Sequence, residues 1–238
     1  MSALRTPAPA GGTIFRHTLN VRICHWINVV AVVYLLLSGL VILGNYPELY
    51  WGKVGYRGHE PAFRLAEWGI NIPKGDNGWG RNTHFLFAWI FSLNGLVYLI
   101  WTLVRRDRRR KLLPQRDQLA WHHVRADLQN HLRLRPPRGD AALRYNVLQK
   151  FSYLFIVLAL APLIVLTGLA QSPGFTAAVP SLLDLFGGRQ SARTLHVIGM
   201  VLMLLFIVVH VAEVFIAGAV NELRAMVTGR FRIPRSDA

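Results

Sequence analysis

Apolar residues in this chain occur in long blocks rather than at a short period. A helix needs about 20 apolar residues to cross a bilayer core of about 30 Å, and the blocks that reach this length are 23–43, 84–104, 151–170 and 195–216. Every backbone amide in lipid must be paired within its own segment, so each block is expected to be a helix. The alternation typical of a membrane barrel is missing. The pattern predicts an all-α membrane protein, a bundle of four transmembrane helices in one domain, 1–238.

The segments outside the four blocks differ from one another. Residues 1–13 are rich in Ala, Pro and Gly and are expected to be a disordered tail. The first block exceeds the roughly 7–15 residues of a signal h-region, so we expect it to be a retained helix. In the connection 105–150, the spacing of apolar residues predicts a short membrane-surface helix over 115–132. Pro162 predicts a kink in the third helix.

Basic residues are concentrated in particular segments, and this distribution predicts the topology. The chain has 27 Lys and Arg against 12 Asp and Glu, and thirteen of the basic residues lie in 105–150. The segment 44–82 is nearly balanced, with five basic and four acidic residues. Lys and Arg mark cytoplasmic loops, so both termini and 105–150 are predicted to be cytoplasmic and 44–82 periplasmic, in a bacterial inner membrane. The basic excess then indicates topology and contact with anionic membrane lipid, and no nucleic-acid partner is predicted.

Cys24 is the only cysteine in the chain. An internal disulfide, a cysteine-ligated iron–sulfur cluster and a C-x-x-C-H haem attachment site are therefore excluded. Any haem in this protein would be a non-covalently bound b-type haem.

Histidines within the spans provide the candidate chemistry, because polar residues in a membrane are costly and functional by default. His25 begins the first span, His84 begins the second, and the fourth carries His196 and His210. The 14 positions between the last two place them about 21 Å apart and about 40° short of four whole turns, on one helix face. The predicted topology then pairs His84 with His196 near the periplasm, and His25 with His210 near the cytoplasm.

Paired imidazoles favour haem iron, because two of them fill both axial positions and leave electron transfer as the favoured chemistry. The four histidines are therefore the predicted ligands of two b-type haems. A zinc site is the rival use of histidine pairs, but it needs about four ligands at one place.

Arginines precede three of these histidines by three positions: Arg22, Arg81 and Arg193. Positions three apart share a helix face, so each arginine lies one turn closer to water, where it can bind a haem propionate. The alternative is that arginines simply extend toward water at helix ends. Among the small residues, Gly39, Gly168 and Gly199 are expected to pack against a flat macrocycle, and Gly95 to allow close helix contact.

Several short stretches also carry a family resemblance: VRICHW (21–26), SG (38–39), LYWG (49–52), YNVLQK (145–150), LTGL (166–169), LHVIG (195–199) and AMVTGRF (225–231). With the four histidines, they resemble the bacterial cytochrome b561 and nickel–iron-hydrogenase b-type cytochrome superfamily. That group includes cytochrome b subunits of formate dehydrogenase and thiosulfate-reductase-like systems. The resemblance implies the same two histidine pairs.

The resemblance also implies substrate and partner. The Asn of the formate dehydrogenase motif lies by the quinone and matches Asn146, whereas the motif's Gly is replaced here by Leu148. The alternative role of Asn146 is a helix N-cap. The LYWG-containing loop is similar to that of membrane anchors of periplasmic molybdopterin oxidoreductases, which implies a separate catalytic partner.

The preferred hypothesis is a di-haem subunit that carries electrons between a periplasmic oxidoreductase and the quinone pool. In this reading the chain is a non-catalytic part of a larger oxidoreductase complex. One alternative keeps the haems but makes the chain a self-contained enzyme, such as a superoxide:quinone oxidoreductase. An alternative of another class is a haem-free membrane transport or structural protein.

Overall fold

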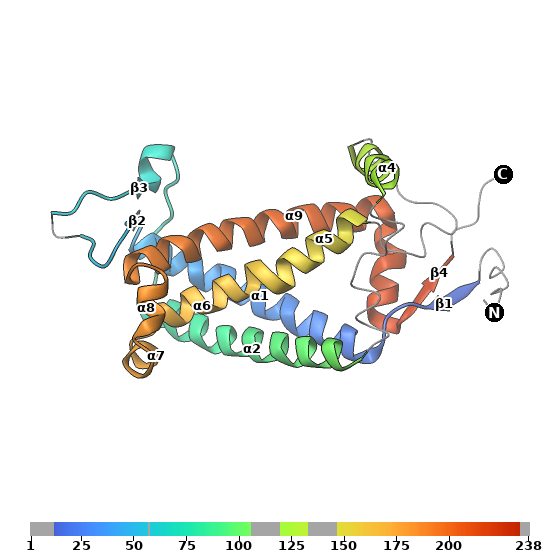
Figure 1. Ribbon diagram of the computed structural model, residues 1–238, viewed down its shortest axis with the longest axis horizontal. Helices are drawn as coiled ribbons and strands as arrows, with labels where there is room; N and C mark the ends of the chain where they lie inside the picture. Colours follow the sequence, from blue (N-terminus) through green and yellow to red (C-terminus); the bar gives the residue numbers. More distant parts are fainter. Residues whose placement is uncertain (1–11, 57, 106–119, 133–146, 234–238) are drawn as a thin grey trace. The chain divides into compact units, whose positions relative to one another are not determined.

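The computed structural model describes residues 12–56, 58–105, 120–132 and 147–233 (Figure 1). Four helical segments are long and apolar enough to cross a membrane: Leu19–Asn45, Asn77–Val104, Val147–Gln171 and Arg189–Thr228. Their outward side chains are apolar; Leu86, Val97 and Leu103, for example, are each more than half exposed. Exposed apolar surface on this scale suits acyl chains rather than water. The all-helical membrane architecture predicted by the sequence is therefore confirmed.

Helices α1 (Leu19–Asn45) and α2 (Asn77–Val104) both extend beyond the predicted apolar blocks. The start of α2 is set by Asp76, whose Oδ1 accepts hydrogen bonds from the backbone N–H of Gly78 at 2.8 Å and of Trp79 at 3.2 Å. This is the N-cap geometry that satisfies the free amides of a first turn. His84 therefore lies two turns inside α2 rather than at its start.

The third span is built from three pieces. Helix α5 (Val147–Phe155) continues through a π-helical segment, η4 (Ile156–Leu160), into α6 (Ala161–Gln171). Pro162 lies at the start of α6 and has no backbone N–H to donate. The irregularity predicted at Pro162 is thus present as a π-helical turn immediately before it.

Helix α9 (Arg189–Thr228) follows two short helices, α7 (Pro173–Ala178) and α8 (Ser181–Leu185). Gly218 interrupts it with φ 102° and ψ 82°, values open to glycine but strained for other residues. The chain turns at this point (Figure 1). A helix is present within the predicted range as α4 (Trp121–Leu132), and its place on the membrane surface stays a prediction; residues 115–119 of that prediction lie outside the described residues.

The residues of the chain group into two compact units. Unit 1 comprises 1–25, 100–154 and 207–238, and unit 2 comprises 26–99 and 155–206. Helices α1, α2 and α9 each contribute residues to both units.

In unit 1 the two ends of the described chain meet. Strand β1 (Thr13–Phe15) pairs antiparallel with β4 (Arg230–Arg232). Arg16 adds an ion pair to Glu222 at 3.1 Å and lies 4.5 Å over the ring of Phe231. Thr13, predicted to belong to a disordered tail, is therefore part of a strand, because its backbone finds a partner that is distant in the sequence.

Unit 2 contains the segment between α1 and α2. Strand β2 (Glu48–Leu49) pairs antiparallel with β3 (Phe63–Arg64), and the 3₁₀ helix η1 (Leu65–Trp68) follows directly. The aromatic rings of Trp51, Phe63 and Trp68 meet edge to face, with centroids 6.4 Å apart at each contact.

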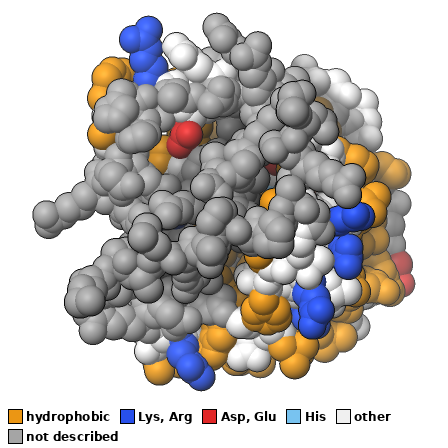
Figure 2. Space-filling model, turned by 90° about the vertical axis from the view of Figure 1, so that its right-hand side faces the viewer, with side chains coloured by type: hydrophobic (Ala, Val, Ile, Leu, Met, Phe, Trp, Pro, Cys, Tyr) orange, Lys and Arg blue, Asp and Glu red, His pale blue; other side chains and the backbone are white. Residues whose placement is uncertain are grey.

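The surface combines lipid-compatible and basic groups. In the view of Figure 2, exposed hydrophobic side chains border Lys and Arg side chains. Such a border is typical of the zone where a membrane protein meets lipid head groups.

Candidate functional site

The structure brings together the two histidine couples that the sequence predicts. In unit 2, the rings of His84 on α2 and His196 on α9 have centroids 6.1 Å apart and planes at 68°. In unit 1, the rings of His25 on α1 and His210 on α9 have centroids 6.4 Å apart and planes at 69°. Each couple therefore joins two different helices within one compact unit.

These distances fit one metal ion between two imidazoles. A metal–imidazole bond of about 2.0–2.1 Å, with about 1.1 Å from the nitrogen to the ring centre, gives a centroid separation of about 6.2–6.4 Å. Plain edge-to-face ring contacts span about 4.5–7 Å, so separation alone does not distinguish the two. Among the described residues, no group of three or more His, Cys, Asp or Glu side chains could hold a metal ion. The zinc alternative therefore finds no site within these ranges.

A hydroxyl group on α1 orients the ring of His84. Ser38 Oγ lies 3.1 Å from His84 Nδ1. The same hydroxyl donates its own proton to the carbonyl oxygen of Tyr34 at 2.6 Å. Its oxygen is therefore an acceptor toward His84, and Nδ1 carries the proton. The ring is left with an unprotonated Nε2, the form that a metal binds.

His196 is held in the same way by the third span. Thr167 Oγ1 lies 3.1 Å from His196 Nδ1 and donates its proton to the carbonyl oxygen of Leu163 at 2.6 Å. The carbonyl oxygen of Ile164 lies 3.0 Å from the same Nδ1 and is a second acceptor. Both acceptors require a proton on Nδ1 and leave Nε2 free for a metal.

Two glycines give these rings their space. A Cβ added at Gly39 would lie 3.4 Å from His84 Cε1, and one added at Gly168 would lie 3.2 Å from His196 Cε1. Each glycine directly follows the hydroxyl residue that binds the same ring. The two stretches Ser38–Gly39 and Thr167–Gly168 therefore form matching cradles, which we call the hydroxyl–glycine cradles.

The other two glycines have different surroundings. A Cβ at Gly199 would lie 2.7 Å from Cγ1 of Ile164, so this glycine permits close contact between α9 and α6. The expectation that Gly199 packs on a macrocycle has no support in these contacts. A Cβ at Gly95 would meet nothing within 4 Å of the described chain, so the close contact expected there is not formed.

The three arginines that precede histidines differ. Arg22 Nε is buried and has no hydrogen-bond partner among the described residues, and the same holds for the hydroxyl oxygen of Thr18, one turn earlier. Arg81 is exposed. Arg193 donates from Nη1 to the carbonyl oxygen of Glu48 at 2.8 Å and to the hydroxyl of Tyr56 at 2.9 Å. A propionate role stays a prediction for all three.

Arg193 belongs to a row of α9 residues that fix the 46–56 segment. Its Nη2 donates to the carbonyl oxygen of Tyr46. Thr194 donates to the carbonyl oxygen of Tyr50 at 2.7 Å, and Ser191 accepts from the backbone N–H of Gly52 at 2.7 Å. The segment is thereby tied to the turn of α9 that precedes His196. We call this set of contacts the loop clamp.

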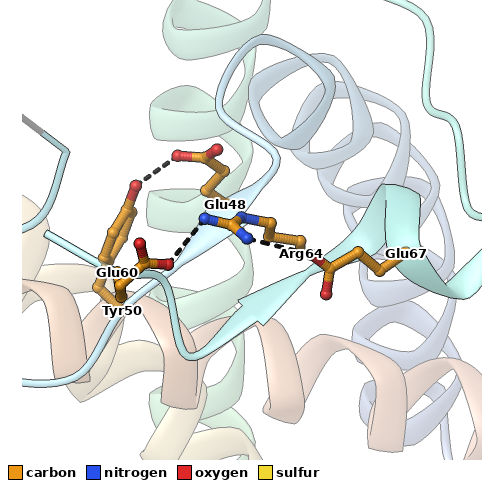
Figure 3. Close-up of polar contacts among 5 residues, drawn as sticks. All are labelled: Glu48, Tyr50, Glu60, Arg64 and Glu67. Carbon is orange, nitrogen blue, oxygen red and sulfur yellow. Dashed lines mark hydrogen bonds and ion pairs between the residues drawn. The ribbon is translucent and has the colours of Figure 1, made fainter. Parts of the chain in front are cut away.

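Polar contacts within 48–67 join Tyr50 to Glu48 and Arg64 to two glutamates (Figure 3). Tyr50 donates its hydroxyl to Glu48; burial, followed by this carboxylate, raises the pKa of Tyr50. Arg64 bridges Glu60 at 2.9 Å and Glu67 at 3.1 Å, and these contacts raise its pKa. The hydroxyl of Tyr50 binds the Glu48 carboxylate, and the guanidinium of Arg64 offsets part of the charge of Glu60 and Glu67.

Sequence reasoning missed Ser38 and Thr167 as partners of the histidines. Their signal was present, because both spans carry a hydroxyl residue directly before a glycine. Asn146, predicted to lie by a quinone, falls outside the described residues.

Comparison with known proteins identifies relatives. A family model described as prokaryotic cytochrome b561 matches residues 16–229. The chain is 32% identical over 218 residues to a putative protein-methionine-sulfoxide reductase subunit, YedZ1, of Azospira oryzae, covering 90% of this chain and 96% of that protein. It is 28% identical over 224 residues to a probable Ni/Fe-hydrogenase B-type cytochrome subunit of Cupriavidus necator, covering 88% and 83%.

Proposed function

The chain belongs to the prokaryotic cytochrome b561 family, and from this premise we propose that it holds two b-type haems, one at each histidine pair. It is a multi-pass membrane cytochrome of the electron-transfer type. The observation that carries the proposal is that the four histidines of the spans meet as two pairs, each built on two different helices, with ring centroids 6.1 Å and 6.4 Å apart. His84 with His196 ligate one haem, and His25 with His210 ligate the other.

The residues present suit electron transfer. A bound haem would supply one-electron chemistry, and two histidines holding it would favour electron transfer over reaction with oxygen. In unit 1, the buried and unpaired Arg22 Nε and Thr18 Oγ1 provide donors for a propionate. His196 and His210 are 14 positions apart on one helix, so haems held by them would lie at different levels of that span.

The distribution of Lys and Arg supports the orientation. We place both termini and the 105–150 connection in the cytoplasm of a bacterial inner membrane, and the 44–82 segment in the periplasm. His84 and His196 then lie toward the periplasm, and His25 and His210 toward the cytoplasm.

A separate oxidoreductase is the proposed partner on the periplasmic side. The names of the two relatives describe subunits of a reductase and of a hydrogenase. The loop clamp supports a partner-binding surface on this side of the membrane. It fixes the 46–56 segment, with its half-exposed Trp51, to the turn of α9 that precedes His196. On the cytoplasmic side we propose exchange with the quinone pool, with Asn146 as a contact.

The test uses His196→Ala and His210→Ala in the purified full-length protein. Each variant is expected to lose one of two b-type haems and to keep the reduced spectrum of the other, with the haem-to-protein ratio falling from about two to about one. Retention of both haems in either variant contradicts the ligand assignment. A wild-type protein without b-type bands contradicts the haem proposal itself, and co-purification of a second polypeptide tests the partner.

A further inference from the structure

The hydroxyl–glycine cradles repeat one arrangement on two helices. Ser38 on α1 and Thr167 on α6 are both fully buried, and each hydroxyl oxygen lies 3.1 Å from the Nδ1 of one histidine of the unit 2 pair. A buried hydroxyl inside a span commonly bonds only the carbonyl one turn back on its own helix. These two make that bond and also reach a ring on another helix, so both faces of one candidate haem have the same support.

The proton positions follow from the contacts. Because each hydroxyl proton is already donated at 2.6 Å to a backbone carbonyl, of Tyr34 or Leu163, the oxygen has only lone pairs to offer the histidine. Both rings therefore donate from Nδ1 and present Nε2 to the space between them. A fixed Nδ1–H bond sets the tautomer and orientation of a metal-binding histidine and raises its basicity.

We propose that Ser38 and Thr167 are positioning residues that lower the midpoint potential of the haem between His84 and His196. This inference rests on the proposed function. An acceptor at Nδ1–H increases electron density on the ligating nitrogen, and a more basic ligand stabilises ferric over ferrous iron. The cradles thus bias this haem toward the oxidised state.

The experiment is a redox titration of the full-length, haem-loaded protein carrying Thr167→Val, matched with Thr167→Ser. Valine keeps the shape but removes the hydroxyl acceptor, which leaves the carbonyl oxygen of Ile164 as the acceptor for His196 Nδ1–H. We expect it to raise one midpoint by a shift equivalent to about tenfold in the reduced-to-oxidised ratio, or about 59 mV for one electron. Serine keeps the acceptor and should retain the wild-type midpoint. The haem of the His25–His210 pair is the internal reference, and the low-spin ferric resonance signal of the affected haem should also move.

Several results would overturn the inference. An unchanged or lower midpoint in Thr167→Val would do so, and so would an equal shift in Thr167→Ser. If Thr167→Val does not retain the haem, Ser38→Ala is titrated in the same way, and the same rise is expected. Loss of this haem from both Thr167→Val and Ser38→Ala would also overturn the inference, because the hydroxyls would then be needed to hold the haem rather than to set its midpoint potential. Failure of the proposed function is distinct, because it would show as wild-type protein without two b-type haems.

Discussion

The absence of a side chain at two glycines leaves room for the histidine rings beside them. A glycine inside a helix costs about 1 kcal/mol relative to alanine, yet Gly39 and Gly168 each lie within a span and beside an imidazole. At Gly168 an added Cβ would lie 3.2 Å from His196 Cε1, closer than an ordinary van der Waals contact. The ring would have to move, and its orientation would change with it.

Gly168→Ala should therefore reduce haem retention at the His84–His196 pair. The expected result is a lower haem-to-protein ratio after purification, with the second haem kept, measured from reduced spectra and total protein. Gly95→Ala is the matched control, because a Cβ there meets nothing within 4 Å. It should keep both haems and increase stability by up to about 1 kcal/mol. Equal haem content in the two variants would contradict the steric account.

The histidine pairs could be predicted from sequence because spacing and topology together determine which histidines share a level. The hydroxyl residues are visible in the sequence as Ser38–Gly39 and Thr167–Gly168, but their contact with the histidines is not, since a Ser or Thr within a span usually bonds its own helix. Only the fold shows that Ser38 and Thr167 also reach a second helix. The surroundings of Gly95 and Gly199 were likewise beyond sequence, because side-chain packing decides them.

Helix ends determine how deep a ligand lies within a span. The Asp76 cap starts α2 well before its apolar block, so His84 has two turns of helix before it. Replacing an N-cap aspartate by alanine costs about 1 kcal/mol.

Asp76→Ala is expected to lower stability by about that amount, because two amides of the first turn lose their acceptor. Thermal unfolding in detergent, followed by helical circular dichroism, measures the change. Asp76→Asn keeps a capping oxygen and should restore most of the loss. Equal destabilisation by Ala and Asn would show that the cap is not what Asp76 contributes.

The loop clamp gives a second prediction at this scale. Arg193→Gln removes donors that hold three groups of the 46–56 segment, so limited proteolysis there should become several-fold faster. Arg64→Gln is the control, because its ion pairs to Glu60 and Glu67 are exposed and contribute little. If both variants were cleaved at the same rate, Arg193 would not be an anchor.

Hydropathy located the spans but not their ends. It registers apolar length, whereas α2 and α9 begin with polar residues that cap or clamp them. The aspartate at 76 was a readable signal for the first of these. The contacts of Arg193 were not readable, because they join residues more than a hundred positions apart.

At the scale of the whole molecule, each of the two compact units contains one complete histidine pair. The number of spans was predictable, because bilayer thickness sets apolar length. The division into two units was not, because it depends on which residues of a long helix pack together.

Reporter fusions test the orientation of the whole chain. A fluorescent protein fused to the C-terminus should fluoresce, and alkaline phosphatase at the same place should be inactive, because the basic flanks hold that end in the cytoplasm. Phosphatase inserted at Gly58, in the segment between α1 and α2, should be active. The reverse pattern would invert the proposed positions of both histidine pairs.

The pairing of β1 with β4 also constrains the order of biogenesis. Strand β4 leaves the ribosome after the four apolar spans, so β1 has no partner strand until residue 232 has been synthesised. The ion pair between Arg16 and Glu222 likewise cannot form before Glu222 has been synthesised. A chain stalled before residue 230 could insert its spans, yet its strand β1 would lack its partner.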